Sequence, residues 1–415
     1  MKKIQSLDGI RGIAILSVMA FHVSPKAAIA KSFFPNNVKL FFNILIYPIS
    51  NLGWAGVDLF FVLSGFLITG ILIDSKSKNR YFTNFYARRF LRIFPIYYLL
   101  LAALLFVGPM FFHSMQSYDC VRQQAYFWSY LQNWQETFRS TTGFQSSFLG
   151  TFWSLAIEEQ FYLFWPLVVY CLPLRTLARL AVGCMIFSCL LRVLVNVGHS
   201  GMDAYNLVHF NLFTRFDALA FGALVAIVSR QRPEAFTKFA RSTGINRLSL
   251  ALGLAFALVI AIGPDDPQIG NTVFRVLGYT LLAALSAVVI IKAVAGKENG
   301  LLVRLLNSRF LVYTGAISYG LYVYHWPIYF FLLQGLKQMW SERHHAMGLA
   351  AFPFVAVGLT FLVAHVSYRF LEAPILRLKR HFETAAGAEA DSRQGATAPG
   401  PRAEADLPRE TDKAS

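Results

Sequence analysis

Long apolar runs, separated by short polar segments, repeat along nearly the whole chain. About ten of these runs reach the ~20 residues that a helix needs to cross the hydrocarbon core of a lipid bilayer. They lie at residues 8–28, 52–73, 90–112, 153–172, 177–197, 209–228, 248–263, 273–295, 311–333 and 349–371. The pattern predicts an all-α protein, a polytopic membrane bundle of about ten transmembrane helices within residues 1–380.

Lysines and arginines cluster in alternate loops of this predicted bundle. The clusters lie at 76–92, 230–247, 292–309 and 377–380, whereas the long loop 113–152 and the segment around Asp265 and Asp266 carry few cations. Cytoplasmic loops of membrane proteins carry an excess of Lys and Arg. We therefore expect a multi-pass membrane protein with both termini in the cytoplasm.

Three segments need a separate interpretation. The apolar patch 40–49 is short and interrupted by Pro48, which predicts an interfacial or re-entrant helix. Residues 381–415 are rich in Ala, Gly, Pro, Ser and mixed charge, and we expect a disordered cytoplasmic tail. The first run also resembles a cleaved signal peptide with an A-x-A site at 28–30, but its internal Arg11 and His22 favour a retained helix.

The composition supports the membrane interpretation. Hydrophobic residues make up 56% of the chain and charged residues only 14%, against ~25% charged residues in soluble domains. The formal net charge of +16 does not indicate nucleic acid binding, because the cations lie between apolar runs. The four cysteines form no disulfide framework and no metal-binding spacing.

Several ionisable residues lie inside the predicted spans, where charge is costly and usually functional. With a rise of ~1.5 Å per residue, one group should share a level in the outer half of the membrane. It comprises His22, Asp58, Glu158, Glu159, Arg215, Asp217 and His325. A second group, Arg11, Arg89 and Arg92, should lie near the cytoplasmic face.

Ordinary structural roles compete with functional ones at these positions. Asp58 suits a helix start near the headgroups, and only one of Glu158 and Glu159 is expected to face inward. Arg215 and Asp217 suit a mutual pair that ties helices together. The histidine before the Trp-Pro pair at 326–327 suits a hydrogen bond to a carbonyl at a kink, and the arginines suit positive-inside anchors. His22 is the hardest to explain structurally.

The residue types suggest group transfer. A histidine beside a carboxylate is a general-base arrangement that removes a hydroxyl proton near neutral pH. We therefore take His22 as the base, oriented by Asp58 or Glu158. Arg89 and Arg92 suit a phosphate-bearing ligand, because guanidinium binds phosphate oxygens in a bidentate manner.

Seven sequence motifs, in order, carry a resemblance to a known family. They are SLDGIRG at 6–12, GVDLFFVLSGFLI at 56–68, RFLRIFP at 89–95, WSLAIEEQFY at 153–162, RFD at 215–217, ISYGLYVYHWP at 317–327 and SYRFLEAP at 367–374. Together they make residues 5–375 resemble the membrane-bound acyltransferase 3 family of bacterial O-acyltransferases.

The resemblance implies a protein of the bacterial inner (plasma) membrane. It implies transfer of an acyl group, usually acetyl, from cytoplasmic acyl-CoA to a hydroxyl of a cell-surface or exported polysaccharide. It also implies that Arg11 and His22 are essential and that Arg89 and Arg92 contact the coenzyme A phosphates. Acetyl-CoA is then a donor substrate, with no permanently bound cofactor and no metal.

Some members of this family carry an appended hydrolase-like domain of the SGNH type after the bundle. Here we expect a variant without that domain, since residues 381–415 form a short polar tail. Either the bundle completes the transfer alone, or a separate periplasmic transferase does.

Other functions stay open at this stage. A proton-coupled transporter or flippase would also bury ionisable groups, and a non-catalytic membrane partner is a third class. Within the enzyme class, the acceptor is a glycan, a small molecule or a lipid-linked sugar. An acyl-histidine intermediate competes with direct transfer. The sequence does not identify the acceptor or the acyl chain.

Overall fold

The computed structural model describes residues 4–23, 52–111, 115, 118–138, 147–262, 270–297, 299–339 and 345–382. Within these residues the chain is helical and contains no strand, as the sequence predicts. The predicted interfacial helix at 40–49 and the tail beyond residue 382 lie outside the described residues.

Ten long helices correspond to the ten predicted spans. They are α1 (Gln5–Val23), α5 (Ala55–Ser75), α6 (Tyr81–Ala102), α11 (Trp153–Cys171), α12 (Leu174–Gly198), α14 (Leu212–Gln231), α16 (Thr243–Ala261), α18 (Tyr279–Ala295), α21 (Ser318–Met339) and α22 (His345–Ser367). In the described part of the chain, eight helical segments are long and apolar enough to cross a membrane. The two other long helices are α11, which carries Glu158 and Glu159, and α21, which carries His325.

Shorter helices connect or extend these spans. Between α6 and α14 they are η2 (Ala103–Val107), α7 (Gly108–Phe111), α8 (Asp119–Arg122), α9 (Ala125–Trp128), α10 (Gln132–Thr137), η5 (Gly150–Phe152) and α13 (Gly201–His209). Later in the chain they are α15 (Pro233–Arg241), η6 (Phe274–Gly278), α19 (Leu301–Leu306), α20 (Arg309–Ala316), η8 (Tyr368–Glu372), α23 (Ala373–Arg377) and η9 (Leu378–Phe382).

Two predicted boundaries were wrong. The predicted span at 311–333 is two helices, α20 and α21, which meet at Ile317. The third span starts at Tyr81 rather than at residue 90, so Arg89 lies inside α6 and not in a loop. Hydropathy misses this start because the first turns of α6 contain polar and basic residues.

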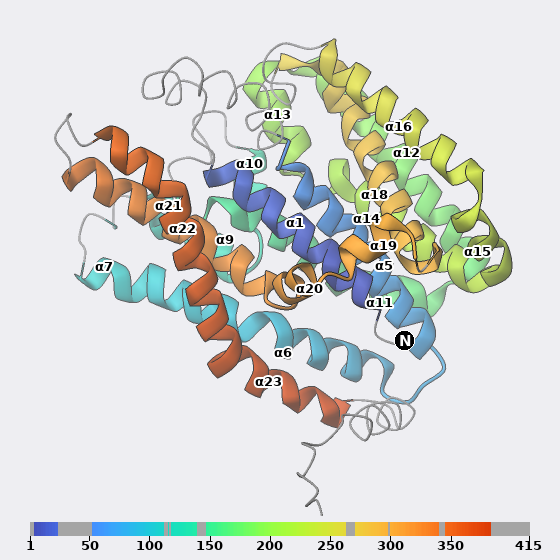
Figure 1. Ribbon diagram of the computed structural model, residues 1–415, viewed down its shortest axis with the longest axis horizontal. Coiled ribbons are helices and arrows are strands. Elements are labelled where there is room, and N and C mark those ends of the chain that lie inside the picture. The colour runs from blue at the N-terminus through green and yellow to red at the C-terminus, as the bar shows by residue number, and fades with distance from the viewer. Residues whose placement is uncertain are drawn as a thin grey trace, which may run out of the picture.

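The helices form an inner group, which includes α5 and α14, and an outer group, which includes α12 and α16 (Figure 1). In α5 and α14, 67% of the most apolar segment is buried, against 17% in α12 and 11% in α16. Helix α5 packs against α1, α11, α14 and α18. The outer helices expose large apolar side chains, for example Leu194 and Leu254, which suits contact with lipid.

Close packing of two inner helices depends on small residues. A Cβ on Gly65 of α5 would lie 2.0 Å from the carbonyl oxygen of Leu219 on α14. A Cβ on Gly222 of α14 would lie 1.9 Å from the carbonyl oxygen of Val62 on α5. The two glycines therefore allow the two backbones to touch reciprocally, as small residues do in membrane helix pairs.

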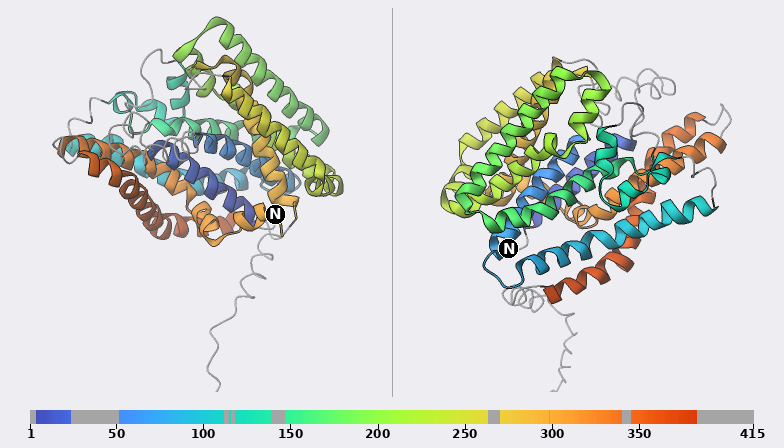
Figure 2. Two further views of the ribbon diagram at one scale, coloured as in Figure 1. Left: turned by 45° about the horizontal axis from the view of Figure 1, so that its top comes forward. Right: turned by 180° about the vertical axis from the view of Figure 1, so that it is seen from behind.

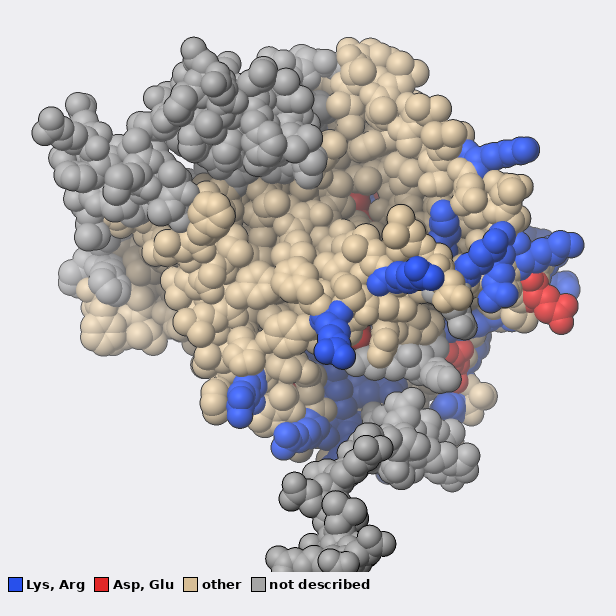
Figure 3. Space-filling view, in the orientation of Figure 1, with Lys and Arg blue, Asp and Glu red and all other residues tan. Residues whose placement is uncertain are grey.

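The described ends of the chain lie at one end of the bundle, where α1 begins and η9 ends (Figure 2). Lysines and arginines gather towards this end on the face shown in Figure 3. Helices α15, α19, α20 and α23 contribute exposed cations there. The cationic loops are thus grouped as the sequence predicts, and their cytoplasmic orientation stays a prediction.

Candidate active site

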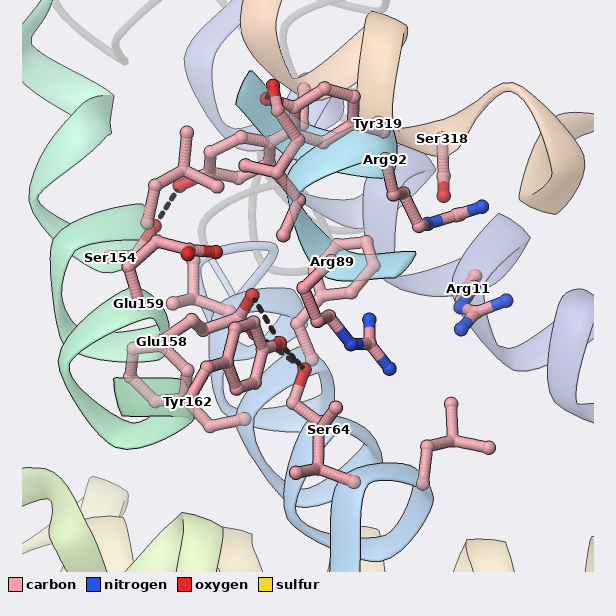
Figure 4. Close-up of a pocket in the computed structure, with 18 residues that line it drawn as sticks. Arg11, Ser64, Arg89, Arg92, Ser154, Glu158, Glu159, Tyr162, Ser318 and Tyr319 are labelled. Atoms are coloured by element: carbon pink, nitrogen blue, oxygen red, sulfur yellow. Dashed lines mark hydrogen bonds between the residues drawn. The ribbon is translucent and has the colours of Figure 1, made fainter. Parts of the chain in front are cut away.

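A cavity of about 100 Å³ lies between α1, α5, α6, α11 and the start of α21. All five helices contribute to its polar lining (Figure 4). The polar lining residues are Arg11, Ser64, Arg89, Arg92, Ser154, Glu158, Glu159, Tyr162, Ser318, Tyr319 and Tyr322. Four predicted site residues, Arg11, Arg89, Arg92 and Glu158, are therefore brought together.

Three arginines line the cavity from two helices (Figure 4). Arg11 of α1 donates to Asp8 at 3.0 Å, one turn earlier on the same helix. Arg89 of α6 lies over the ring of Tyr162, 5.2 Å from its centroid. In the described part of the chain, neither Arg89 nor Arg92 forms an ion pair. Glu159 and Glu158 lie within electrostatic reach of Arg89, but a guanidinium that forms no direct ion pair is available to bind an anionic ligand.

Glu158 is held by two hydroxyl groups. Its Oε1 accepts a hydrogen bond from Ser64 of α5 at 2.7 Å, and its Oε2 accepts one from Tyr162 at 3.1 Å. Tyr162 also lies 3.0 Å from the hydroxyl of Ser64. Glu159 lines the same cavity, so the interpretation that only one of the two glutamates faces inward was wrong.

His22 lies on α1 beyond the cavity lining. It follows Arg11 by eleven residues, which corresponds to about 16 Å along the helix axis. Its Nδ1 lies 3.2 Å from Nε2 of His325 on α21, and its ring packs edge-on against Trp326 with centroids 4.9 Å apart. The partner of His22 on α21 is therefore an imidazole, whereas the sequence suggested a carboxylate.

Neither predicted carboxylate orients His22. Asp58 of α5 instead forms a buried ion pair with Arg215 of α14 at 2.8 Å, and both oxygens of Glu158 bond to hydroxyl groups within the cavity. The expectation that Asp58 or Glu158 orients His22 was wrong. Glu158 and Glu159 line one cavity with Arg11 and Arg89, so the prediction that they share the level of His22, apart from these arginines, was wrong. Asp58 faces Arg215 because each helix has its own rotation about its axis.

The arginine and aspartate of α14 also pair differently from the prediction. Asp217 accepts hydrogen bonds from Arg192 of α12 and from Thr280 of α18, both at 2.8 Å. Arg215 bonds to Asp58, so the predicted mutual pair of Arg215 and Asp217 was wrong. The two side chains still tie helices together, each with a partner on another helix.

Several site residues were missed from the sequence. Ser64, Tyr162 and Tyr319 line the cavity, and they occur in the sequence motifs without a charge that would mark them. Lys379 of η9 lies within electrostatic reach of Arg92, Arg89 and Arg11. A lysine after the last span looks like a positive-inside anchor, and only the packing of η9 against α6 reveals its neighbours.

Known proteins resemble nearly the whole of this chain. The family model described as an acyltransferase domain matches residues 4–369. A peptidoglycan O-acetyltransferase of Listeria monocytogenes is 28% identical over 90% of this chain and 56% of its own length. A putative peptidoglycan O-acetyltransferase of Bacillus subtilis is 29% identical over 90% of this chain and 55% of its own.

A third relative, an O-acetyltransferase of Staphylococcus aureus, is 26% identical over 89% of this chain and 56% of its own length. The chain thus spans just over half the length of the curated relatives it matches. No solved structure matches it. Its apolar helices and the extent of the family match make it a multi-pass membrane protein, and the chain belongs to the acyltransferase 3 family.

Proposed function

We propose that this protein transfers an acyl group, in the first place acetyl, from acyl-CoA in the cytoplasm to a hydroxyl of a cell-wall glycan outside the inner membrane. One observation carries the proposal. Helix α1 places Arg11 in the wall of an arginine-lined cavity and His22 about 16 Å further along its axis. An anion site and a base at this separation suit a long donor with phosphates at one end and a thioester at the other.

The arginines supply the donor site of this proposal. Arg89 and Arg92 have no ion pair with the described residues, and their planar guanidinium groups match phosphate oxygens. Arg11 lies near the start of α1, at the end of the bundle that carries the cationic loops. That end is the cytoplasmic one by the positive-inside rule, so cytoplasmic acyl-CoA would enter there.

His22 supplies the base. The acceptor hydroxyl gives its proton to an imidazole nitrogen of His22 as its oxygen attacks the thioester carbonyl carbon. The bond between this carbon and the sulfur then breaks, and the thiolate takes the proton back to leave as free coenzyme A. The products are one ester and one thiol, so that atoms and charge balance.

The names of the relatives support the choice of acceptor in this proposal. Two of them are named as an established and a putative peptidoglycan O-acetyltransferase, and this supports a peptidoglycan sugar hydroxyl as the acceptor. These relatives extend well beyond the region they share with this chain. In this proposal the bundle either delivers the acyl group to the glycan or passes it to a separate periplasmic transferase.

The test uses proteoliposomes that contain the full chain and acetyl-CoA labelled in its acetyl group. We expect release of free thiol and transfer of label to added peptidoglycan fragments, and we expect His22→Ala to abolish both. His365→Ala is the matched control, because His365 is an exposed histidine on α22 that bonds to Tyr313.

The outcomes separate the competing functions. Thiol release with labelled glycan supports the proposal, and label that remains on His22 without an acceptor would replace direct transfer with an acyl-histidine intermediate. Thiol release that needs an added periplasmic fraction points to the separate transferase. Equal thiol release by wild type and His22→Ala, with both proteins folded, would show that His22 is not the base. No thiol release by folded wild type would overturn the proposal and favour a transporter.

A further inference from the structure

His325 of α21 makes contacts from both of its ring nitrogens. Its Nδ1 lies 2.6 Å from the carbonyl oxygen of Tyr322, one turn earlier on the same helix. Its Nε2 lies 3.2 Å from Nδ1 of His22. The residue is only 1% exposed, so the protein interior determines which nitrogen carries a proton.

We propose that His325 is a positioning residue that holds the proton of His22 on Nδ1 and leaves Nε2 of His22 as the proton acceptor. The inference rests on the proposed function, because it assigns the basic atom of that reaction. It places His325 one hydrogen bond away from the reacting groups.

The tautomers follow from the chemistry of the partners. A carbonyl oxygen only accepts hydrogen bonds, so Nδ1 of His325 must carry the proton and donate to Tyr322. In the neutral ring, Nε2 of His325 is then an acceptor. Nδ1 of His22 must therefore donate to it, which leaves the lone pair of His22 on Nε2.

The surroundings hold His325 in place. Its neighbour Trp326 donates from Nε1 to the carbonyl oxygen of Ser147 at 2.8 Å. Tyr322 donates to the carbonyl oxygen of Thr151 at 2.9 Å and bonds to the hydroxyl of Ser154. The turn of α21 that carries His325 is thus anchored to the start of α11 and to the segment before it.

A base keeps its ring oriented when its other nitrogen donates to a fixed acceptor. During the proposed reaction, Nε2 of His22 takes the hydroxyl proton, and the ring becomes an imidazolium that still donates from Nδ1 to His325. His325 gains no proton in this step, and its role is orientation alone.

Two variants of His325 test the proposal by activity. His325→Leu removes the acceptor, and we expect kcat to fall by about 10- to 100-fold, the loss seen when the partner that orients a metal-bound histidine is removed. KM for acetyl-CoA should stay unchanged, because the arginines of the donor site are untouched. His325→Gln offers an amide oxygen near the position of Nε2, and we expect it to recover most of this loss.

A spectroscopic measurement tests the proposal without activity. In wild-type protein labelled with ¹⁵N-histidine, solid-state NMR should show Nδ1 of His22 protonated and Nε2 unprotonated, with the signal identified by its loss in His22→Ala. In His325→Leu this preference should weaken towards a mixture of tautomers, whereas the signals of His365 should stay the same.

The two measurements keep the outcomes distinct. A protonated Nε2 on neutral His22 in the wild type overturns the inference, and so does a His325→Leu variant with wild-type kcat and an unchanged spectrum. If no sample transfers acetyl groups but the NMR result holds, the proposed function fails while the tautomer assignment stands. If His325→Leu does not fold, the wild-type spectrum still tests the tautomer of His22, and the kcat of His325→Gln still tests the role of His325.

Discussion

Asp58 of α5 and Arg215 of α14 form an ion pair of 2.8 Å in which each side chain is only 1% exposed. The guanidinium of Arg215 also lies over the ring of Tyr279, 3.9 Å from its centroid. Among the described residues, Asp58 Oδ2 and two nitrogens of Arg215 have no hydrogen-bond partner. Each charge therefore depends mainly on the other for compensation.

We predict that Asp58→Ala destabilises the protein, because Arg215 would stay buried without its counterion. Removing one partner of a buried pair typically costs about 3–5 kcal/mol. Asp74→Ala is the matched control. Asp74 forms an ion pair with Arg230, but the Asp74 side chain is 39% exposed. Exposed ion pairs contribute ~1 kcal/mol or less to stability. Thermal unfolding in detergent measures the difference.

A double variant, Asp58→Leu with Arg215→Leu, should recover much of the lost stability, because neither charge then remains buried. A structural role would be contradicted if the Asp58→Ala protein were as stable as wild type but no longer transferred acetyl groups. Asp58 would then act in the reaction, as the sequence suggested.

We predict that Gly65→Ala and Gly222→Ala each weaken the contact between α5 and α14. The added Cβ would lie 2.0 Å from a backbone oxygen at Gly65 and 1.9 Å at Gly222, and a backbone oxygen cannot move away as a flexible side chain can. Overpacking typically costs ~1–3 kcal/mol, and we expect a loss at or above this range. Yield of folded protein and its unfolding temperature are the measurements.

Gly253→Ala in α16 is the control for these two variants. A Cβ at this position meets nothing within 4 Å, and alanine favours a helix over glycine by ~1 kcal/mol. We expect unchanged or slightly higher stability there. Equal behaviour of Gly65→Ala and Gly253→Ala would show that α5 and α14 are not in backbone contact.

We predict that Arg89→Ala raises KM for acetyl-CoA more than it lowers kcat. A hydrogen bond to a charged group contributes ~1.5–3 kcal/mol, which corresponds to roughly a 10- to 100-fold change in KM. Arg88→Ala is the neighbouring control, because Arg88 lies outside the cavity lining and donates to the carbonyl oxygen of Asn84 at 3.0 Å.

A donor without the nucleotide phosphates shows which part of the molecule Arg89 contacts. With S-acetylpantetheine, wild type and Arg89→Ala should have the same KM, because the phosphates that the guanidinium binds are missing. A penalty that persists with this donor would mean that Arg89 acts on the thioester or on the fold instead.

We predict that Glu158→Ala is more damaging than Glu159→Ala. Loss of the Glu158 carboxylate removes the acceptor of the Ser64 hydroxyl, whereas Tyr162 can still donate to Ser64 at 3.0 Å. An unsatisfied buried polar group costs ~1–3 kcal/mol. Glu159 lines the cavity but accepts no such bonds within the described residues. The unfolding temperature and KM for acetyl-CoA compare the two variants, and equal losses would contradict the hydroxyl network.

The sequence by itself determined the membrane class, the long helices and the grouping of cations at one end. These follow from the length of apolar runs and from charge counts, which need no knowledge of neighbours. Depth along a helix was readable in part. It placed His22 at the level of His325 and Arg11 at the level of Arg89, but it also placed Glu158 at the level of His22, whereas Glu158 lines a cavity with Arg11.

Only the tertiary structure decided which ionisable groups touch. Asp58, Glu158 and His22 were expected at one level, yet Asp58 faces Arg215, Glu158 faces Ser64, and His22 faces His325. The rise per residue gives height, but the rotation of each helix about its axis is set by packing, as by Gly65 against α14. A difference of one residue turns a side chain by about 100°, so height alone cannot assign a partner.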